Sequence, residues 1–126
     1  MFGCYDTVTL WRRKNGDNKD NEIFEVSVIP VKCKWRSREN RVATENGAIS
    51  KRYVTVIVPY ENGYKFNGKV GDYMALGRHK TKITGEQPHR VNDVKEALNP
   101  DFMQITYIKD STRSTMGRKW RAEGVV

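Results

Sequence analysis

Residues 102–125 read FMQITYIKDSTRSTMGRKWRAEGV, and the pattern predicts two strands joined by a polar turn. Side chains of a strand point alternately to its two faces. A strand over 103–109 therefore places three residues on one face: Met103, Ile105 and Tyr107. A second strand over 119–126 returns around Trp120. The chain is expected to end in a β-hairpin.

Four further strands and one short strand are predicted upstream of this hairpin. They cover residues 5–13, 23–31, 31–38, 53–59 and 73–76. In the strand 53–59, three valines oppose Tyr53, Thr55 and Ile57, and both faces are apolar enough to be covered. Pro30 lacks a backbone N–H, which favours an edge strand or a bend at that point. Short strands with glycine corners are typical of a compact barrel or sandwich.

One short helix and long loops complete the prediction. Val94, Ala97 and Leu98 recur at helical spacing behind Asn92 as a candidate cap, and Asn99-Pro100 ends the run. Segment 39–50 contains Asn46-Gly47, a turn signal, and is expected to be a mobile loop or a hairpin tip. With 126 residues the chain is one domain long. We therefore predict a mainly β fold, a small antiparallel β-barrel or sandwich with one short helix and long loops, over residues 1–126.

The composition favours a protein with partners. Hydrophobic residues make up 37% and charged residues 30%, so we expect a thin core and a surface partly covered by other molecules. The formal net charge of +8 attracts polyanions such as nucleic acid, an anionic membrane or an acidic protein face. No apolar run approaches the roughly 18 residues of a membrane span, and the N-terminus lacks a signal-peptide pattern. We expect a protein made and used in a cytosol, with no membrane partner.

The chain offers no pattern of catalytic, cofactor or metal residues. Neither His79 nor His89 sits in a metal or triad spacing, so both are expected to be surface or hydrogen-bonding residues. The glycines between 63 and 77 are not followed by Gly-Lys-Ser/Thr, so they are turn residues. Cys4 and Cys33 have no ligand neighbours and are expected to be buried or free thiols; a disulfide is the alternative and would indicate a secreted origin. A non-enzymatic protein is predicted.

A row of basic residues is the one local feature with a possible binding role. In the strand 31–38, Cys33 and Trp35 point to one side, and all four residues on the other side are basic. These residues are about 7 Å apart, comparable to phosphate spacing in a nucleic-acid strand. Three interpretations stay open: a solvated or aggregation-resistant strand, contact with an acidic subunit, and contact with nucleic acid. The candidate charged or DNA-facing residues are Lys32, Lys34, Arg36, Arg38, Arg41, Lys51 and Arg52.

The order of several short motifs resembles a known class of proteins. The motifs are Val54-Thr-Val-Ile-Val-Pro59, Val70-Gly-Asp-Tyr-Met-Ala-Leu-Gly77, Phe102 to Ile108, Asp110-Ser-Thr112 and Arg118-Lys-Trp-Arg-Ala-Glu-Gly124. In this succession the chain is similar to the small head-to-tail connection proteins of tailed bacteriophages, of the minor capsid, head-closure or stopper type. Lys119 stands where that class often has histidine. The likeness covers roughly half of the chain.

The resemblance implies a structural protein of the virion, made in the host cytoplasm. Its protomer would be a β-barrel in a homo-oligomeric ring that closes the DNA-filled head and docks the tail. The implied partners are further copies, a portal or adaptor protein, a tail terminator or tail tube protein, and DNA in the channel. Loops such as 39–50 and 60–70 would reach neighbours or the channel.

Two other functions stay open. One is a tail-completion or adaptor protein of the same connector. The other is a cytosolic OB-like module that binds single-stranded nucleic acid through the basic strand and its aromatic residues. Trp11, Trp35 and Trp120 are more typical of core residues than of base-stacking ones. Salt-sensitive oligonucleotide binding by a monomer would favour the module, and rings would favour the connector.

Overall fold

A computed structural model describes residues 3–13, 23–45, 47–84, 89–113 and 117–126. The described chain is mainly β, as predicted, with one short helix. Its elements are β1 (Val8–Arg13), β2 (Phe24–Val28), β3 (Lys34–Thr44), β4 (Gly47–Pro59), β5 (Tyr73–Leu76), α1 (Val91–Leu98), β6 (Phe102–Asp110) and β7 (Lys119–Val125). Predicted strands 5–13 and 23–31 are longer than β1 and β2, and β3 begins later than predicted and runs further.

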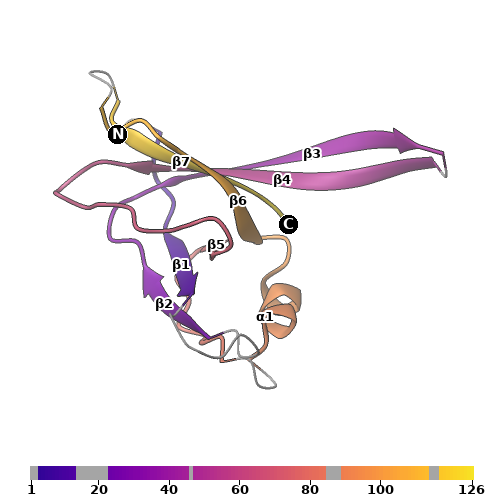
Figure 1. The fold of residues 1–126 in the computed structure, drawn as a ribbon, viewed down its shortest axis with the longest axis horizontal. Helices are drawn as coiled ribbons and strands as arrows, with labels where there is room; N and C mark the ends of the chain where they lie inside the picture. The colour runs from indigo at the N-terminus through magenta and orange to yellow at the C-terminus, as the bar shows by residue number, and fades with distance from the viewer. Residues whose placement is uncertain (1–2, 14–22, 46, 85–88, 114–116) are drawn as a thin grey trace.

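All seven strands form one antiparallel sheet in the order β2-β1-β5-β6-β7-β4-β3. The sheet curls into a half-barrel, with α1 beside the start of β6 (Figure 1). This confirms the small, barrel-like β fold. β2 lies at one edge, as Pro30 predicted, and the chain bends at Pro30 itself. β3 forms the other edge.

The main core lies on the concave face of the sheet. Alternate residues of β1, β4 and β7 point there, including Leu10, Val56 and Trp120. The loop between β4 and β5 closes over this core, because Phe66 is buried and its ring lies 6.2 Å from that of Trp120. Part of the segment 60–70, expected to reach outward, therefore packs on its own sheet. The face of β4 opposite the valines is only half-buried, so the prediction that both faces are covered is wrong.

A second core lies on the other face of β1 and β5. Trp11 packs at its centre, with its ring centroid 5.6 Å from that of Phe102. Tyr73 stacks on Phe102 at 5.2 Å, and α1 contributes Val94. Val8 and Leu10 of β1 belong to the main core, whereas Trp11 belongs to the second, because faces alternate along the strand. Trp11 and Trp120 are buried and Trp35 is partly buried against the core, as predicted for core tryptophans.

The helix begins one residue earlier than the predicted cap. α1 spans Val91–Leu98 with Arg90 as its N-cap, so Asn92 lies inside the helix. The Asp93 carboxylate accepts a hydrogen bond from the Arg90 backbone N–H at 3.2 Å, which satisfies a donor that a helix start leaves free. The helix ends at Asn99, whose N–H donates to the Lys95 carbonyl, and the predicted stop at Asn99-Pro100 is confirmed.

The segment 39–50 forms the outer part of a long hairpin, so of the two expectations the hairpin tip is confirmed and the loop is wrong. β3 and β4 pair continuously from Lys34–Ile57 to Thr44–Gly47. Thr44 pairs with Gly47, so only residues 45 and 46 lie between the two strands, and Asn46 is outside the described residues. Gly47 has φ +114°, which glycine adopts without strain. The ladder extends because each added residue pair continues the register set by the buried valines of β4. This outer part, residues 39–52, is called the arm below.

The terminal hairpin is confirmed, but one of its face predictions is wrong. β6 pairs with β7, and the register shifts between Ile105 and Tyr107. Such a bulge adds one residue to β6 and reverses the faces beyond it. Met103 and Ile105 are buried, whereas Tyr107 is 52% exposed and Ile108 packs on the core. The predicted polar turn starts at Asp110, and its residues 114–116 lie outside the described part.

Candidate interaction surface

The convex face of β3, β4, β7 and β6 collects basic side chains from all four strands. Residues that pair directly across an antiparallel sheet share a face. One row across the strands is Lys34, Ile57, Arg121 and Lys109, and the next is Arg36, Thr55, Glu123 and Tyr107. Strands that are far apart in the sequence thus combine their charges on one surface.

This surface is called the cationic face. Within the described side chains of these strands it has seven basic residues and one carboxylate, Glu123. Arg121 and Glu123 form an ion pair at 2.9 Å with both side chains well exposed, and such surface pairs contribute about 1 kcal/mol or less. The face therefore stays strongly positive. Its basic residues are Lys34, Arg36, Arg38, Lys51, Lys109, Lys119 and Arg121.

A groove of about 320 Å³ runs over the centre of the cationic face. Half-buried Thr55 and Ile57 of β4 line it between two sets of cations. Arg36 and Arg38 stand on β3, and the others come from β6 and β7: Lys109, Lys119 and Arg121. β3 and β7 flank β4, so the cations of these two strands are about 10 Å apart, twice the spacing of neighbouring strands; Lys109 lies one strand further out, on β6.

The structure brings together only part of the set predicted from the sequence. Lys34, Arg36 and Arg38 lie on the cationic face, and Lys51, paired with Asn40, extends it onto the arm. Lys32 precedes β3, and its Nζ donates a hydrogen bond to the Thr7 hydroxyl at 2.8 Å.

The last two predicted residues lie elsewhere. Arg52 pairs with Glu39 and belongs to the opposite face of the sheet, because faces alternate along a strand. Arg41 pairs with Ser50 in the arm, and its side chain lies outside the described part. The seven residues therefore do not form one surface.

Three residues of the cationic face were missed from the sequence: Lys109, Lys119 and Arg121. The alternation of Lys119 and Arg121 with buried Trp120 and Ala122 was a usable signal for two of them. Lys109 gave no such signal, because the bulge in β6 decides its face. That β7 pairs with β4, and β6 with β7, is a property of the whole sheet.

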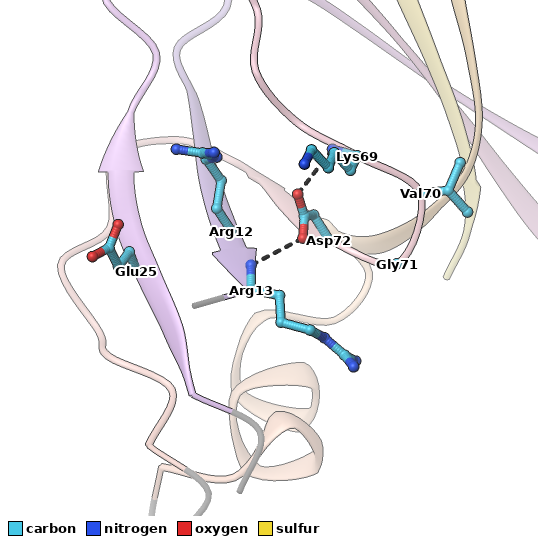
Figure 2. A pocket seen from close by; sticks show the side chains of 7 residues that line it. All are labelled: Arg12, Arg13, Glu25, Lys69, Val70, Gly71 and Asp72. Carbon is cyan, nitrogen blue, oxygen red and sulfur yellow. Dashed lines mark hydrogen bonds between the residues drawn. The ribbon is translucent and has the colours of Figure 1, made fainter. Parts of the chain in front are cut away.

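A larger hollow, of about 600 Å³, lies where β1 ends (Figure 2). Asp72 lines it and is only 5% exposed. One carboxylate oxygen accepts a hydrogen bond from the Arg13 N–H at 3.0 Å, and the other accepts one from the Lys69 N–H at 2.8 Å. Asp72 thus ties the loop before β5 to the end of β1. The Gly71-Asp72 pair before the short strand thus has a structural role: Asp72 makes these two bonds, and Gly71 takes a φ of +98°, which favours glycine.

His79 is a packed, hydrogen-bonding residue of the fold. The His79 ring stacks on Trp11 with centroids 6.1 Å apart, and its Nε2 lies 2.8 Å from the Leu76 carbonyl oxygen. The buried Thr9 hydroxyl donates to the Gly77 carbonyl and accepts from the His79 N–H.

Cys4 and Cys33 are buried free thiols. Burial raises the pKa of the Cys33 thiol to about 12, with smaller contributions from Cys4 and Asp6.

Two kinds of feature are absent from the described residues. No group of three or more histidine, cysteine or acidic residues there is placed to bind a metal ion. No helix in that part is both long and apolar enough to span a bilayer.

Comparison with known proteins identifies a family. A model described as "Family of unknown function (DUF6751)" matches residues 4–125. No curated protein and no solved structure matches the chain.

Proposed function

This chain belongs to the DUF6751 family of unknown function, and we propose that it is a non-enzymatic ring protein of the tailed-phage neck. In this role it closes the DNA-filled head and docks the tail. A tail-completion or adaptor position in the same connector is the related alternative. The motif succession from Val54 to Gly124 supports the neck assignment.

The arm is the observation that carries the assembly part of the proposal. β7 pairs with β4 only from Tyr53 to Pro59, so residues 39–52 extend beyond it as two strands. Six residues of each strand reach about 20 Å, and Figure 1 shows β3 and β4 projecting from the body. A two-stranded hairpin is marginal alone in water, and a neighbouring molecule that packs on it would stabilise it.

The outer edge of β3 supports contact with a second copy. Near its start the edge is covered, because Asp6 bridges Cys33 and the Asp6 carboxylate accepts from the Trp35 N–H at 2.9 Å. Backbone N–H groups alternate in direction along a strand. With the Trp35 N–H turned outward, the next N–H groups that face the open edge are those of Ser37, Glu39, Arg41 and Ala43. A long edge strand of this kind is a template for pairing.

A ring follows if the arm of one copy meets a different surface of the next. β3 and β2 lie at opposite edges of the sheet, so an arm-to-body contact is heterologous. Repeated heterologous contacts close into a ring when the rotation allows it. The ring would lie between a portal or adaptor protein and a tail terminator or tail tube protein, with DNA in its channel.

The experiment is to shorten the arm. Residues 41–50 are replaced by Asn-Gly, which leaves every core residue of both clusters in place. The full chain is expected to sediment as an assembly of 14.6 kDa protomers and to show rings in electron micrographs. The shortened variant is expected to sediment as a monomer with unchanged circular dichroism. Glu45→Gln at the tip keeps the arm length and is the matched control.

Docking tests the neck assignment. Tailless DNA-filled heads that carry a portal are mixed with the full chain and with the shortened variant. Retention of the full chain on the heads, at the portal vertex only, is expected. A full chain that stays monomeric at micromolar concentration both with and without heads would contradict the proposal.

A further inference from the structure

We propose that the groove of the cationic face binds the phosphodiester backbone of a nucleic acid. All residues of the groove belong to one protomer, so binding there does not depend on ring formation. It also uses residues that the basic row of β3 alone does not include. Its basis is the two-sided arrangement of cations along an uncharged floor.

The floor suits a sugar-phosphate chain. Thr55 and Ile57 are half-buried, carry no charge and lie between the two sets of cations. The cations of β3 and β7 are about 10 Å apart across β4, so one backbone strand along the floor has cations on both sides. Arg36 and Arg38 are about 7 Å apart along β3, comparable to the spacing of successive phosphates. Arginine can also donate two parallel hydrogen bonds to a phosphate.

The length of the cationic face favours a polymer over a small anion. On its β4 floor the face runs from Pro59, which pairs with Lys119, to Lys51 on the arm. These nine residues span roughly 27 Å, several phosphates of a nucleic-acid strand. Tyr107, 52% exposed, lies beside Glu123 at one margin, where its ring is available to a base.

The composition of the face favours nucleic acid over an acidic protein. Centres of protein–protein interfaces are depleted of lysine and rich in apolar anchors. Four of the seven cations here are lysines: Lys34, Lys51, Lys109 and Lys119. Among the described side chains of the face, the large apolar and aromatic ones are Tyr53, Ile57, Tyr107 and Val125, against seven cations. A phosphate polymer needs no such anchors, because its affinity comes from charge and counterion release.

Binding is measured by fluorescence anisotropy with a labelled 20-base-pair duplex and with one of its strands. If three to four phosphates are neutralised, affinity is expected to fall about 100-fold between 50 and 200 mM salt. Comparison of the duplex with the single strand tells which form supplies the backbone. Absence of salt-dependent binding to both probes would overturn the proposal.

Matched variants locate the site. Arg36→Glu with Arg121→Glu is expected to lower affinity at least about 100-fold, since two contacts become repulsions. Lys65→Glu with Lys80→Glu changes the net charge equally at exposed positions off the face, and a loss under about threefold is expected. Equal losses in both variants would show that only net charge matters and would overturn the groove.

Two further readouts distinguish a phosphate-binding groove from a surface that binds any polyanion. Bound DNA is expected to protect Lys109 and Lys119 from acetylation while Lys65 and Lys80 stay reactive. Poly-glutamate is expected to compete at least about tenfold less well than DNA of equal charge, because it lacks the phosphate geometry that arginine recognises. Equal competition would assign the face to an acidic polypeptide instead. Because the assay uses one protomer's residues, its failure leaves the ring proposal standing, and the reverse also holds.

Discussion

Substitution of Gly124 by alanine should destabilise the protein more than any neighbouring change in β7. Gly124 pairs with Ile105 of β6 on one side and with Val54 of β4 on the other. A Cβ atom there would overlap the Gln104 carbonyl oxygen and lie 2.7 Å from Met103 Sδ. The methionine can move, but the carbonyl belongs to a paired strand. β6 and β7 must therefore separate next to the bulge.

The expected cost follows from three contributions. Overpacking of a close contact costs about 1 to 3 kcal/mol. Loss of one or two ladder hydrogen bonds adds about 1 kcal/mol each. Removal of a glycine restricts the unfolded chain and returns about 0.5 to 1 kcal/mol. The net loss in the free energy of unfolding is about 2 to 4 kcal/mol, or a fall in Tm of roughly 8 to 16 °C for a chain of this length.

Urea unfolding followed by tryptophan fluorescence measures this loss, since Trp120 lies on the same strand. Glu123→Ala and Val125→Ala are the controls, because both side chains point away from the core; each is expected to cost less than about 1 kcal/mol. A Gly124→Ala protein that unfolds at the same urea concentration as these controls would refute the close approach of β6 and β7 at this point.

Two further predictions concern buried polar groups. Asp72→Ala leaves two backbone N–H groups without their acceptor and should lower the free energy of unfolding, measured by thermal unfolding, by about 2 to 3 kcal/mol. Asp72→Asn should have a smaller effect. If Asp72→Ala and Asp72→Asn were equally stable, the tie between the loop and β1 would be contradicted. For Cys33, burial raises the pKa from 9.0 to about 12, so its contribution is full below pH 9 and is lost as pH rises toward 12. The free energy of unfolding, measured in urea, should fall between pH 9 and 11 by up to about 1.4 kcal/mol per pH unit in the wild type and by less in Cys33→Ala; parallel pH dependences of the two proteins would contradict this.

Local periodicity was enough to predict the strands that carry the core. The valines of β4 and the residues around Trp120 alternate along their own strands, and alternation within a single strand is enough to predict which side chains share a face. The bulge in β6 could not be predicted in this way. It places Tyr107 on the surface, and it lies opposite Gly124, almost twenty residues further along the chain.

The cationic face depends even more on contacts that are distant in sequence. Arg36 and Arg121 share a face only because β4 pairs with β3 on one side and with β7 on the other. The basic residues near the arm show the same dependence on register. Lys51 and Arg52 are adjacent, yet pairing of Tyr53 with Arg38 places Lys51 on the cationic face and Arg52 behind it. The sequence prediction placed Lys51 and Arg52 in one basic set because both are basic and adjacent.

Hydrogen exchange of the arm in the assembled protein tests most directly whether a neighbouring copy completes it. The arm amides of Glu39, Arg41 and Ala43 face the open edge of β3, and in dilute monomer they should exchange rapidly. In the assembly they should become protected, while the amides of Thr9 and Val56 inside the sheet stay protected in both states. Arm amides that exchange equally fast in monomer and assembly would contradict pairing through this edge.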